Sequence, residues 1–100
     1  MRVEFEAKLW IWDARPGENW TFVSLPVEES DLIRDATEGV RRGFGSLRVR
    51  ATVGGSTWTT SIFPGGGEGA YILPIKRQIR TAESIEAGDP AAVTVELLDV

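Results

Sequence analysis

Two sets of side chains in this sequence have the chemistry to bind a partner. The first set is basic and comprises Arg48, Arg50, Lys76, Arg77 and Arg80. Guanidinium and ammonium groups pair with phosphates and carboxylates. These side chains would form one anion-binding patch if the strand around residue 49 lay beside the helix expected after residue 74. The alternative is that they are solvated charges, paired with acidic side chains of a neighbouring strand.

The second set is aromatic. Trp10 and Trp12 lie on one face of an expected strand, where large rings would either cover the core or give contact area to a ligand or a protein partner. Trp20 and Trp58 are expected to pack in the interior or across its mouth.

Three further patterns are weaker candidates for chemistry. The glycine-rich segment 65–69 could offer backbone N–H groups to a phosphate, but it lacks the Gly-Lys-Ser/Thr ending of a P-loop, and we interpret it as a hairpin loop. Glu4, Glu6 and Asp13 could make an acid pair or a Mg²⁺ site, yet their spacing is equally that of a solvated strand face. The hydroxyl-rich segment 56–63 has no nucleophile elbow.

The composition excludes several classes of site. The chain has no cysteine and no histidine, which removes disulfides, thiol chemistry, imidazole bases and His/Cys zinc sites. We therefore predict no catalytic residue, no metal site and no cofactor. The first thirteen residues carry charges throughout, and no apolar run approaches the ~20 residues of a membrane helix. We expect a cytoplasmic protein that does not contact membranes.

Charge is distributed unevenly along the chain. Residues 1–40 hold four basic and nine acidic side chains, residues 41–81 hold seven basic and one acidic, and residues 82–100 hold five acidic and none basic. The basic middle could attract an anion, but the acidic flanks argue against a nucleic-acid partner. We expect an unknown protein or a small anionic ligand as the partner, and a monomer or a homodimer.

Most of the chain follows a period of two, which indicates strands with one buried face. The predicted strands cover residues 3–12, 20–25, 47–53 (with Phe44 as an alternative start), 56–63, 70–73 and 92–98. The first two should form a hairpin around Pro16-Gly17. Helices are predicted over 28–37 and from Pro74 onward, the second burying Ile75, Ile79 and Ala82 on one face.

These elements predict an all-β fold. Many short strands at even spacing in 100 residues are typical of a small closed or double-split β-barrel, here of about six strands with one or two short helices, in a single domain over residues 1–100. A barrel also removes the exposed edge strands of an open sheet.

The order of motifs resembles one bacterial and archaeal family of small β-barrels, domain-of-unknown-function family number nineteen-zero-five. The motifs are Trp20-Thr-Phe-Val-Ser-Leu-Pro26, Arg42-Gly-Phe-Gly-Ser46, Gly54-Gly-Ser-Thr-Trp58, Tyr71-Ile-Leu-Pro74, Ile79-Arg80 and Gly88-Asp89. The resemblance covers nearly the whole chain and implies no catalytic residue.

The C-terminal part also resembles the swapped-hairpin DNA-binding barrels of the AbrB/MazE type, through Leu73-Pro74, Ile79-Arg80 and Gly88-Asp89. It departs from them in having Ser84 where a glycine is usual. Three functions are therefore considered: a non-enzymatic accessory or binding domain as the leading hypothesis, a nucleic-acid-binding barrel as the alternative, and a small enzyme as the least supported.

Overall fold

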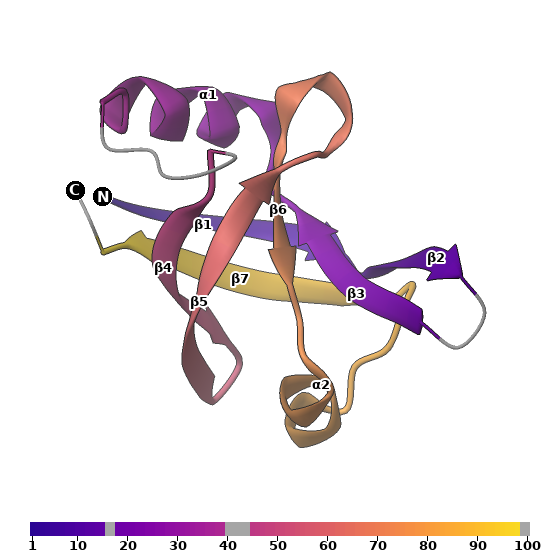
Figure 1. Cartoon of the computed structure of the whole chain (residues 1–100). Helices are drawn as coiled ribbons and strands as arrows, with labels where there is room; N and C mark the ends of the chain where they lie inside the picture. The colour runs from indigo at the N-terminus through magenta and orange to yellow at the C-terminus, as the bar shows by residue number, and fades with distance from the viewer. Residues whose placement is uncertain (16–17, 40–44, 99–100) are drawn as a thin grey trace.

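The computed structural model describes residues 1–15, 18–39 and 45–98 (Figure 1). It is mostly β, which confirms the predicted fold class, and it has seven strands where the sequence predicts about six. The strands are β1 (Arg2–Lys8), β2 (Trp10–Arg15), β3 (Glu18–Ser24), β4 (Leu47–Val53), β5 (Ser56–Pro64), β6 (Tyr71–Pro74) and β7 (Pro90–Leu97). The other described elements are helices α1 (Val27–Ala36) and α2 (Arg77–Glu83) and a 3-10 turn, η1 (Gly67–Gly69).

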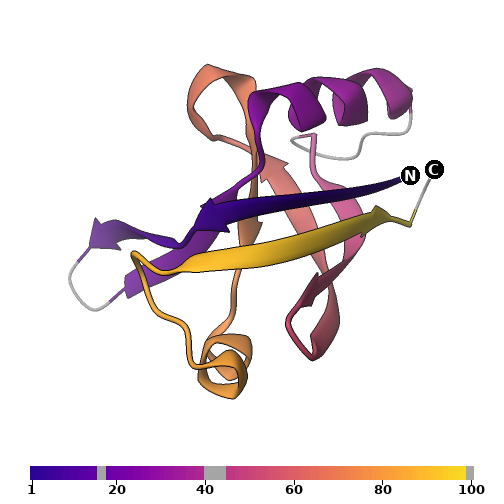
Figure 2. The same cartoon turned by 180° about the vertical axis from the view of Figure 1, so that it is seen from behind.

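The seven strands form one curled sheet in the order β1-β7-β4-β5-β6-β3-β2, with every pair antiparallel. Strands β1 and β2 are consecutive in the chain, separated only by Leu9, yet they lie at opposite ends of this order. The sheet must therefore curl back on itself, and Figures 1 and 2 show the resulting half-barrel.

Leu9 is the residue at which the predicted first strand divides in two. Its N–H donates to the Asp89 carbonyl at 3.0 Å and its carbonyl accepts from the Gly88 N–H at 2.8 Å, so it stays bonded to the turn before β7. After Leu9 the chain leaves β7 and pairs with β3. Ile11, which the alternation places in the core, is 47% exposed. That prediction was wrong because the chain changes partner and sheet edge between the two halves.

The core lies on the concave side of the sheet. Alternate residues of β4 and β7 are buried there, among them Val49, Ala51, Val93 and Val95, as the period of two predicts. The helices lie at opposite ends of the half-barrel (Figure 1). Helix α1 buries Ile33 completely.

The α2 end differs in detail from the prediction. Pro74 completes β6 opposite Phe22, and the helix begins three residues later, at Arg77. Ile75 and Ile79 are buried as predicted, at 1% and 8% exposure. Ala82 is exposed, because the seven-residue helix docks through Ile79, the one residue within it that is buried.

The end of α2 is fixed to the β4–β5 turn. The Glu83 carboxylate accepts hydrogen bonds from the Ser56 hydroxyl at 2.6 Å and the Gly55 N–H at 3.3 Å. Gly54 adopts a φ of +58°, and a Cβ at that position would collide with the same carboxylate. The turn predicted at Pro16-Gly17 and the alternative strand start at Phe44 lie outside the described residues.

Candidate functional site

The β2–β3 hairpin gathers four aromatic rings on one face. Its register sets Trp12 opposite Trp20 and Trp10 opposite Phe22. Directly opposite residues of an antiparallel pair project to the same side, so the four rings lie together on the outer, convex face. The Trp10 and Phe22 ring centroids are 5.2 Å apart, and those of Trp20 and Phe22 are 6.2 Å apart with an interplanar angle of 13°.

The four rings differ in exposure. Phe22 is buried beneath its neighbours, and Trp10 is half-buried, with its indole N–H donating to the Ser24 hydroxyl at 3.0 Å. Trp12 and Trp20 are 51% and 56% exposed. Trp10 and Phe22 are thus the supporting layer, and Trp12 and Trp20 form the outer surface. The prediction that Trp20 packs in the interior or across its mouth was wrong, because its ring lies on the outer face, whereas Trp58 is buried as predicted.

The aromatic face contains a hollow of about 290 Å³. Trp10, Trp12, Phe22, Gly65 and Ile72 line it. Gly65 belongs to the glycine-rich segment, which connects the antiparallel strands β5 and β6 as the predicted hairpin loop. We call this space the aromatic hollow.

A second hollow, of about 200 Å³, lies where β6 runs into α2. We call it the cationic hollow; its lining residues are Trp20, Thr21, Pro74, Ile75, Lys76, Arg77 and Arg80. The Arg80 Nε donates to the Ile75 carbonyl at 3.1 Å, which fixes that guanidinium near the start of the helix. The side chains of Lys76 and Arg77 are exposed and form no ion pair or hydrogen bond with any described residue.

The two hollows share a border. Trp20 lines the cationic hollow and stacks on Phe22, which lines the aromatic hollow. Pro74 also lines the cationic hollow and lies directly opposite Phe22 in the sheet. We call the combined site the aromatic–cationic surface; it consists of Trp10, Trp12, Trp20, Phe22, Lys76, Arg77 and Arg80. It joins the predicted aromatic set to three members of the predicted basic set.

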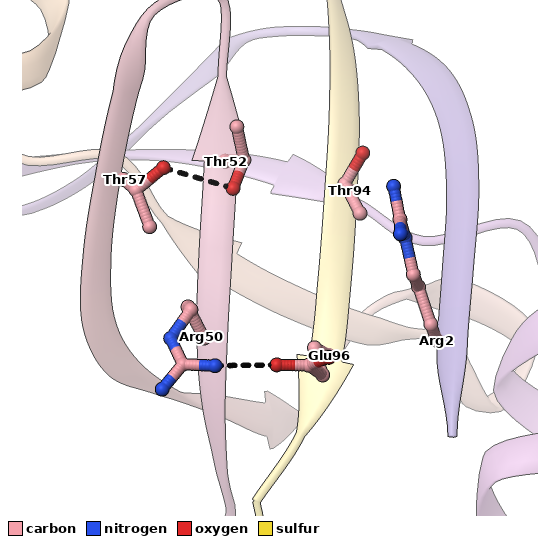
Figure 3. Close-up of a pocket in the computed structure, with 6 residues that line it drawn as sticks. All are labelled: Arg2, Arg50, Thr52, Thr57, Thr94 and Glu96. Carbon is pink, nitrogen blue, oxygen red and sulfur yellow. Dashed lines mark hydrogen bonds and ion pairs between the residues drawn. The ribbon is translucent and has the colours of Figure 1, made fainter.

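The other two members of the basic set lie elsewhere. Arg48 and Arg50 project from the outer face of β4, and Arg50 Nη1 pairs with Glu96 Oε1 at 2.6 Å. Arg50 lines a separate hollow of about 270 Å³ on this face with Arg2, Thr52, Thr57, Thr94 and Glu96 (Figure 3). The five cations therefore do not form one patch. Arg50 instead pairs with an acidic side chain of the neighbouring strand β7, which is the alternative considered in the sequence analysis.

The hollow in Figure 3 has a structural explanation. The Thr52 and Thr57 hydroxyls lie 3.1 Å apart and share one hydrogen bond, and the Arg50 guanidinium donates to the Glu96 carboxylate. Arg2 pairs at 3.2 Å with Glu4, which lies two residues further along the same strand, β1. Because its charged groups already have partners, this face offers less to a ligand than the aromatic–cationic surface does.

Sequence reasoning missed Trp20 and Phe22 of this surface, and Thr21 in the lining of the cationic hollow. Trp20 could have been placed by fixing the hairpin register, since pairing Trp12 with Trp20 puts both on one face. Thr21 gives no such signal: it is 5% exposed, lines the cationic hollow, and its hydroxyl forms no hydrogen bond with any described residue. Within the described ranges, no three His, Cys, Asp or Glu side chains gather closely enough to hold a metal ion.

Fold and surface together define a small, mostly β half-barrel with a composite aromatic and basic face. The sequence pattern of the family described as Domain of unknown function (DUF1905) matches residues 5–95, which is most of the chain, and the protein belongs to that family. No protein with a curated description matches the chain. None of the helices in the described part of the chain has the length and apolar character needed to cross a bilayer.

Proposed function

We propose that this protein is a non-enzymatic binding domain, and that its ligand binds at the aromatic–cationic surface. The observation that carries the proposal is the position of two exposed tryptophans beside two unpaired cations. Trp12 and Trp20 are each more than half exposed, and the side chains of Lys76 and Arg77 have no partner among the described residues.

The exposure of the tryptophans is costly for a protein that only has to fold. A tryptophan side chain can bury 150–250 Å², so leaving half of it in water forgoes roughly 100 Å² of burial. At about 25 cal/mol per Å², that is about 2–3 kcal/mol for each ring. A ligand that covers both rings would recover this free energy, and Lys76 and Arg77 would favour a ligand that carries negative charge.

The chemistry of the surface supports binding rather than catalysis. The chain has no histidine and no cysteine, the side chains whose ordinary pKa values lie nearest to neutrality or that act as ready nucleophiles. The cationic hollow offers ammonium, guanidinium and hydroxyl groups, which can hold an anion but form no acid–base pair.

Thermal-shift measurements on the whole chain test the proposal. A panel of anionic metabolites, with and without aromatic rings, is compared on the wild type, on Trp20→Ala/Arg77→Ala and on Arg48→Ala. A ligand at 100 times its Kd stabilises the native state by about 2.7 kcal/mol, which raises the Tm of a domain this size by roughly 10–20 °C. We expect the shift to persist in Arg48→Ala, which removes a cation from another face, and to disappear in the double variant.

Equal stabilisation of all three proteins would place the ligand elsewhere, and a panel without any stabilising compound would count against a small anionic ligand.

Duplex DNA is the weaker candidate for this surface. Binding of duplex DNA would be most favourable if all five cations of the basic set lay on one surface. Arg48 and Arg50 instead project from β4, away from the hollow that Lys76, Arg77 and Arg80 line. A cytoplasmic, bacterial setting remains part of the proposal and can be checked by immunoblotting fractionated bacterial cells.

A further inference from the structure

We infer that the ligand of the aromatic–cationic surface is a mononucleotide: a planar aromatic ring joined to a phosphate, with the ring in the aromatic hollow and the phosphate in the cationic hollow. This inference rests on the proposed function and names the ligand class for the same site.

The aromatic hollow has the walls that a planar ring requires. Trp10, Trp12 and Phe22 contribute rings, and Ile72 contributes an aliphatic side chain. The Trp10 ring is held in place by its hydrogen bond to Ser24 and by contact with Phe22. The outer wall, Trp12, is exposed and offers a large flat apolar side. A heteroaromatic base stacks on such side chains because every base presents a π-face.

The cationic hollow has the groups that a phosphate requires. Lys76, Arg77 and Arg80 supply positive charge, which suits a phosphate dianion better than a single carboxylate. Thr21 lines the same hollow, and its hydroxyl has no hydrogen-bond partner among the described residues. The hydroxyl is not one of the buried atoms of the structure, so it is open to the hollow. A hydroxyl can donate to a phosphate oxygen, so Thr21 would add one neutral hydrogen bond to the contacts of the three cations.

The spacing of the hollows suits one small molecule that occupies both. Trp12 lines the aromatic hollow, Trp20 lines the cationic hollow, and the two residues are cross-strand neighbours on β2 and β3, so the hollows adjoin across the hairpin. The aromatic hollow, of about 290 Å³, and the cationic hollow, of about 200 Å³, together fall within the roughly 300–1,000 Å³ of small-molecule sites.

The charge around the site favours a mononucleotide over a long polyanion. Affinity for a nucleic-acid chain rises with the number of phosphates that are neutralised, and three cations among the described side chains line the cationic hollow. On the adjoining side, Arg77 and Arg80 share a hollow with Glu86 and Asp89, which limits the positive field beyond the site. The net charge of −4 acts in the same direction.

Calorimetric titration of the whole chain at fixed salt tests this inference, with adenosine 5′-monophosphate (AMP), adenosine, inorganic phosphate, benzoate and an eight-residue oligothymidylate as probes. We expect AMP to bind at least tenfold more tightly than adenosine, phosphate or benzoate. Trp12→Ala should weaken AMP about tenfold and leave phosphate unchanged. Arg77→Gln should weaken AMP and phosphate and leave adenosine unchanged, and Arg48→Gln, the matched control, should change neither. Circular dichroism melting confirms that each variant is folded.

The other outcomes overturn the inference in distinguishable ways. Equal affinity for AMP and adenosine would remove the phosphate from the site, and equal affinity for benzoate and AMP would remove the nucleotide specificity. Oligothymidylate binding tighter than AMP, with a steep salt dependence, would replace the mononucleotide by single-stranded nucleic acid. Binding of a ring-free anion but not AMP would overturn the ligand class and leave the proposed binding function intact, whereas failure of all five probes and of the anion panel would overturn both.

Discussion

Ile79 is the residue on which the docking of α2 depends. Its side chain is 8% exposed and belongs to the same buried cluster as Ile75 and Trp58. Replacing it by aspartate removes nearly all of its apolar burial, which costs about 2 kcal/mol. Placing a carboxylate in the same site costs about 2–3 kcal/mol more, whether the group takes up a proton or draws in water. We therefore expect Ile79→Asp to lower the free energy of unfolding by about 4–5 kcal/mol, a large part of the 5–15 kcal/mol typical of a domain.

The assay is urea unfolding followed by tryptophan fluorescence, with thermal melting as a second probe. A loss of this size lowers the Tm of a domain of about 100 residues by roughly 15–30 °C. Ala82→Asp is the matched control, because it places the same charge on an exposed position of the same helix. It should cost at most about 1 kcal/mol, from the lower helix propensity of aspartate and from a negative charge in the last turn. Equal unfolding midpoints for the two variants would refute the reasoning, since α2 could then contribute no buried face.

Three further predictions concern the rest of the fold. A double-mutant cycle on Arg50 and Glu96, measured by urea unfolding, should give a coupling of at most about 1 kcal/mol, because both side chains are about half exposed; a coupling above about 2 kcal/mol would show that solvent screening is much weaker than assumed. Gly54→Ala should lower the free energy of unfolding by about 1–3 kcal/mol, seen as a lower Tm, because Gly54 has a positive φ and lies against the Glu83 carboxylate. Gly55→Ala is the control, since the position has open space around it and its Tm should not fall. Similar melting of the two variants would argue against this turn geometry. The tag-free chain has no His or Cys and should bind zinc more weakly than micromolar by calorimetry, so micromolar or tighter binding would reveal a site made of carboxylates.

The local patterns of the sequence predict the central strands well, because their environment is repetitive. Alternation over 47–53 and 92–98 yields the buried faces of β4 and β7, since each of these strands has strand partners on both sides and one face on the core. The break at Leu9 is different. The alternation continues through it unchanged, and Ile11 lies opposite the buried Thr21, on the inner side of the sheet. It is nevertheless exposed, because the change of partner from β7 to β3 makes β2 the last strand of the sheet. The change of strand partner depends on residues far along the chain, so it cannot be predicted from the local periodicity of the sequence.

The candidate site was predictable in its residue types but not in its grouping. Trp10 and Trp12 share a face because they are two residues apart in a strand, and Lys76, Arg77 and Arg80 are close along the chain. The separation of Arg50 from α2, and the arrival of Trp20 beside Arg77, depend on strand order and hairpin register. Neither is encoded by spacing, so the local patterns predict two separate sets of residues, and the fold joins the whole aromatic set to three of the five basic residues.

The most direct test of the aromatic–cationic surface uses the indole N–H signals of the four tryptophans in a two-dimensional ¹H–¹⁵N spectrum during an AMP titration. Trp12 and Trp20 border the site, and Trp58 is 9% exposed in the core. We predict saturable shifts of the Trp12 and Trp20 signals with one common Kd, an unchanged Trp58 signal, and loss of the response in Arg77→Gln at the same AMP concentrations. Shifts confined to Trp58 or to the backbone of β4, or no shift of Trp12 and Trp20 at millimolar AMP, would contradict the assignment of this surface as the binding site.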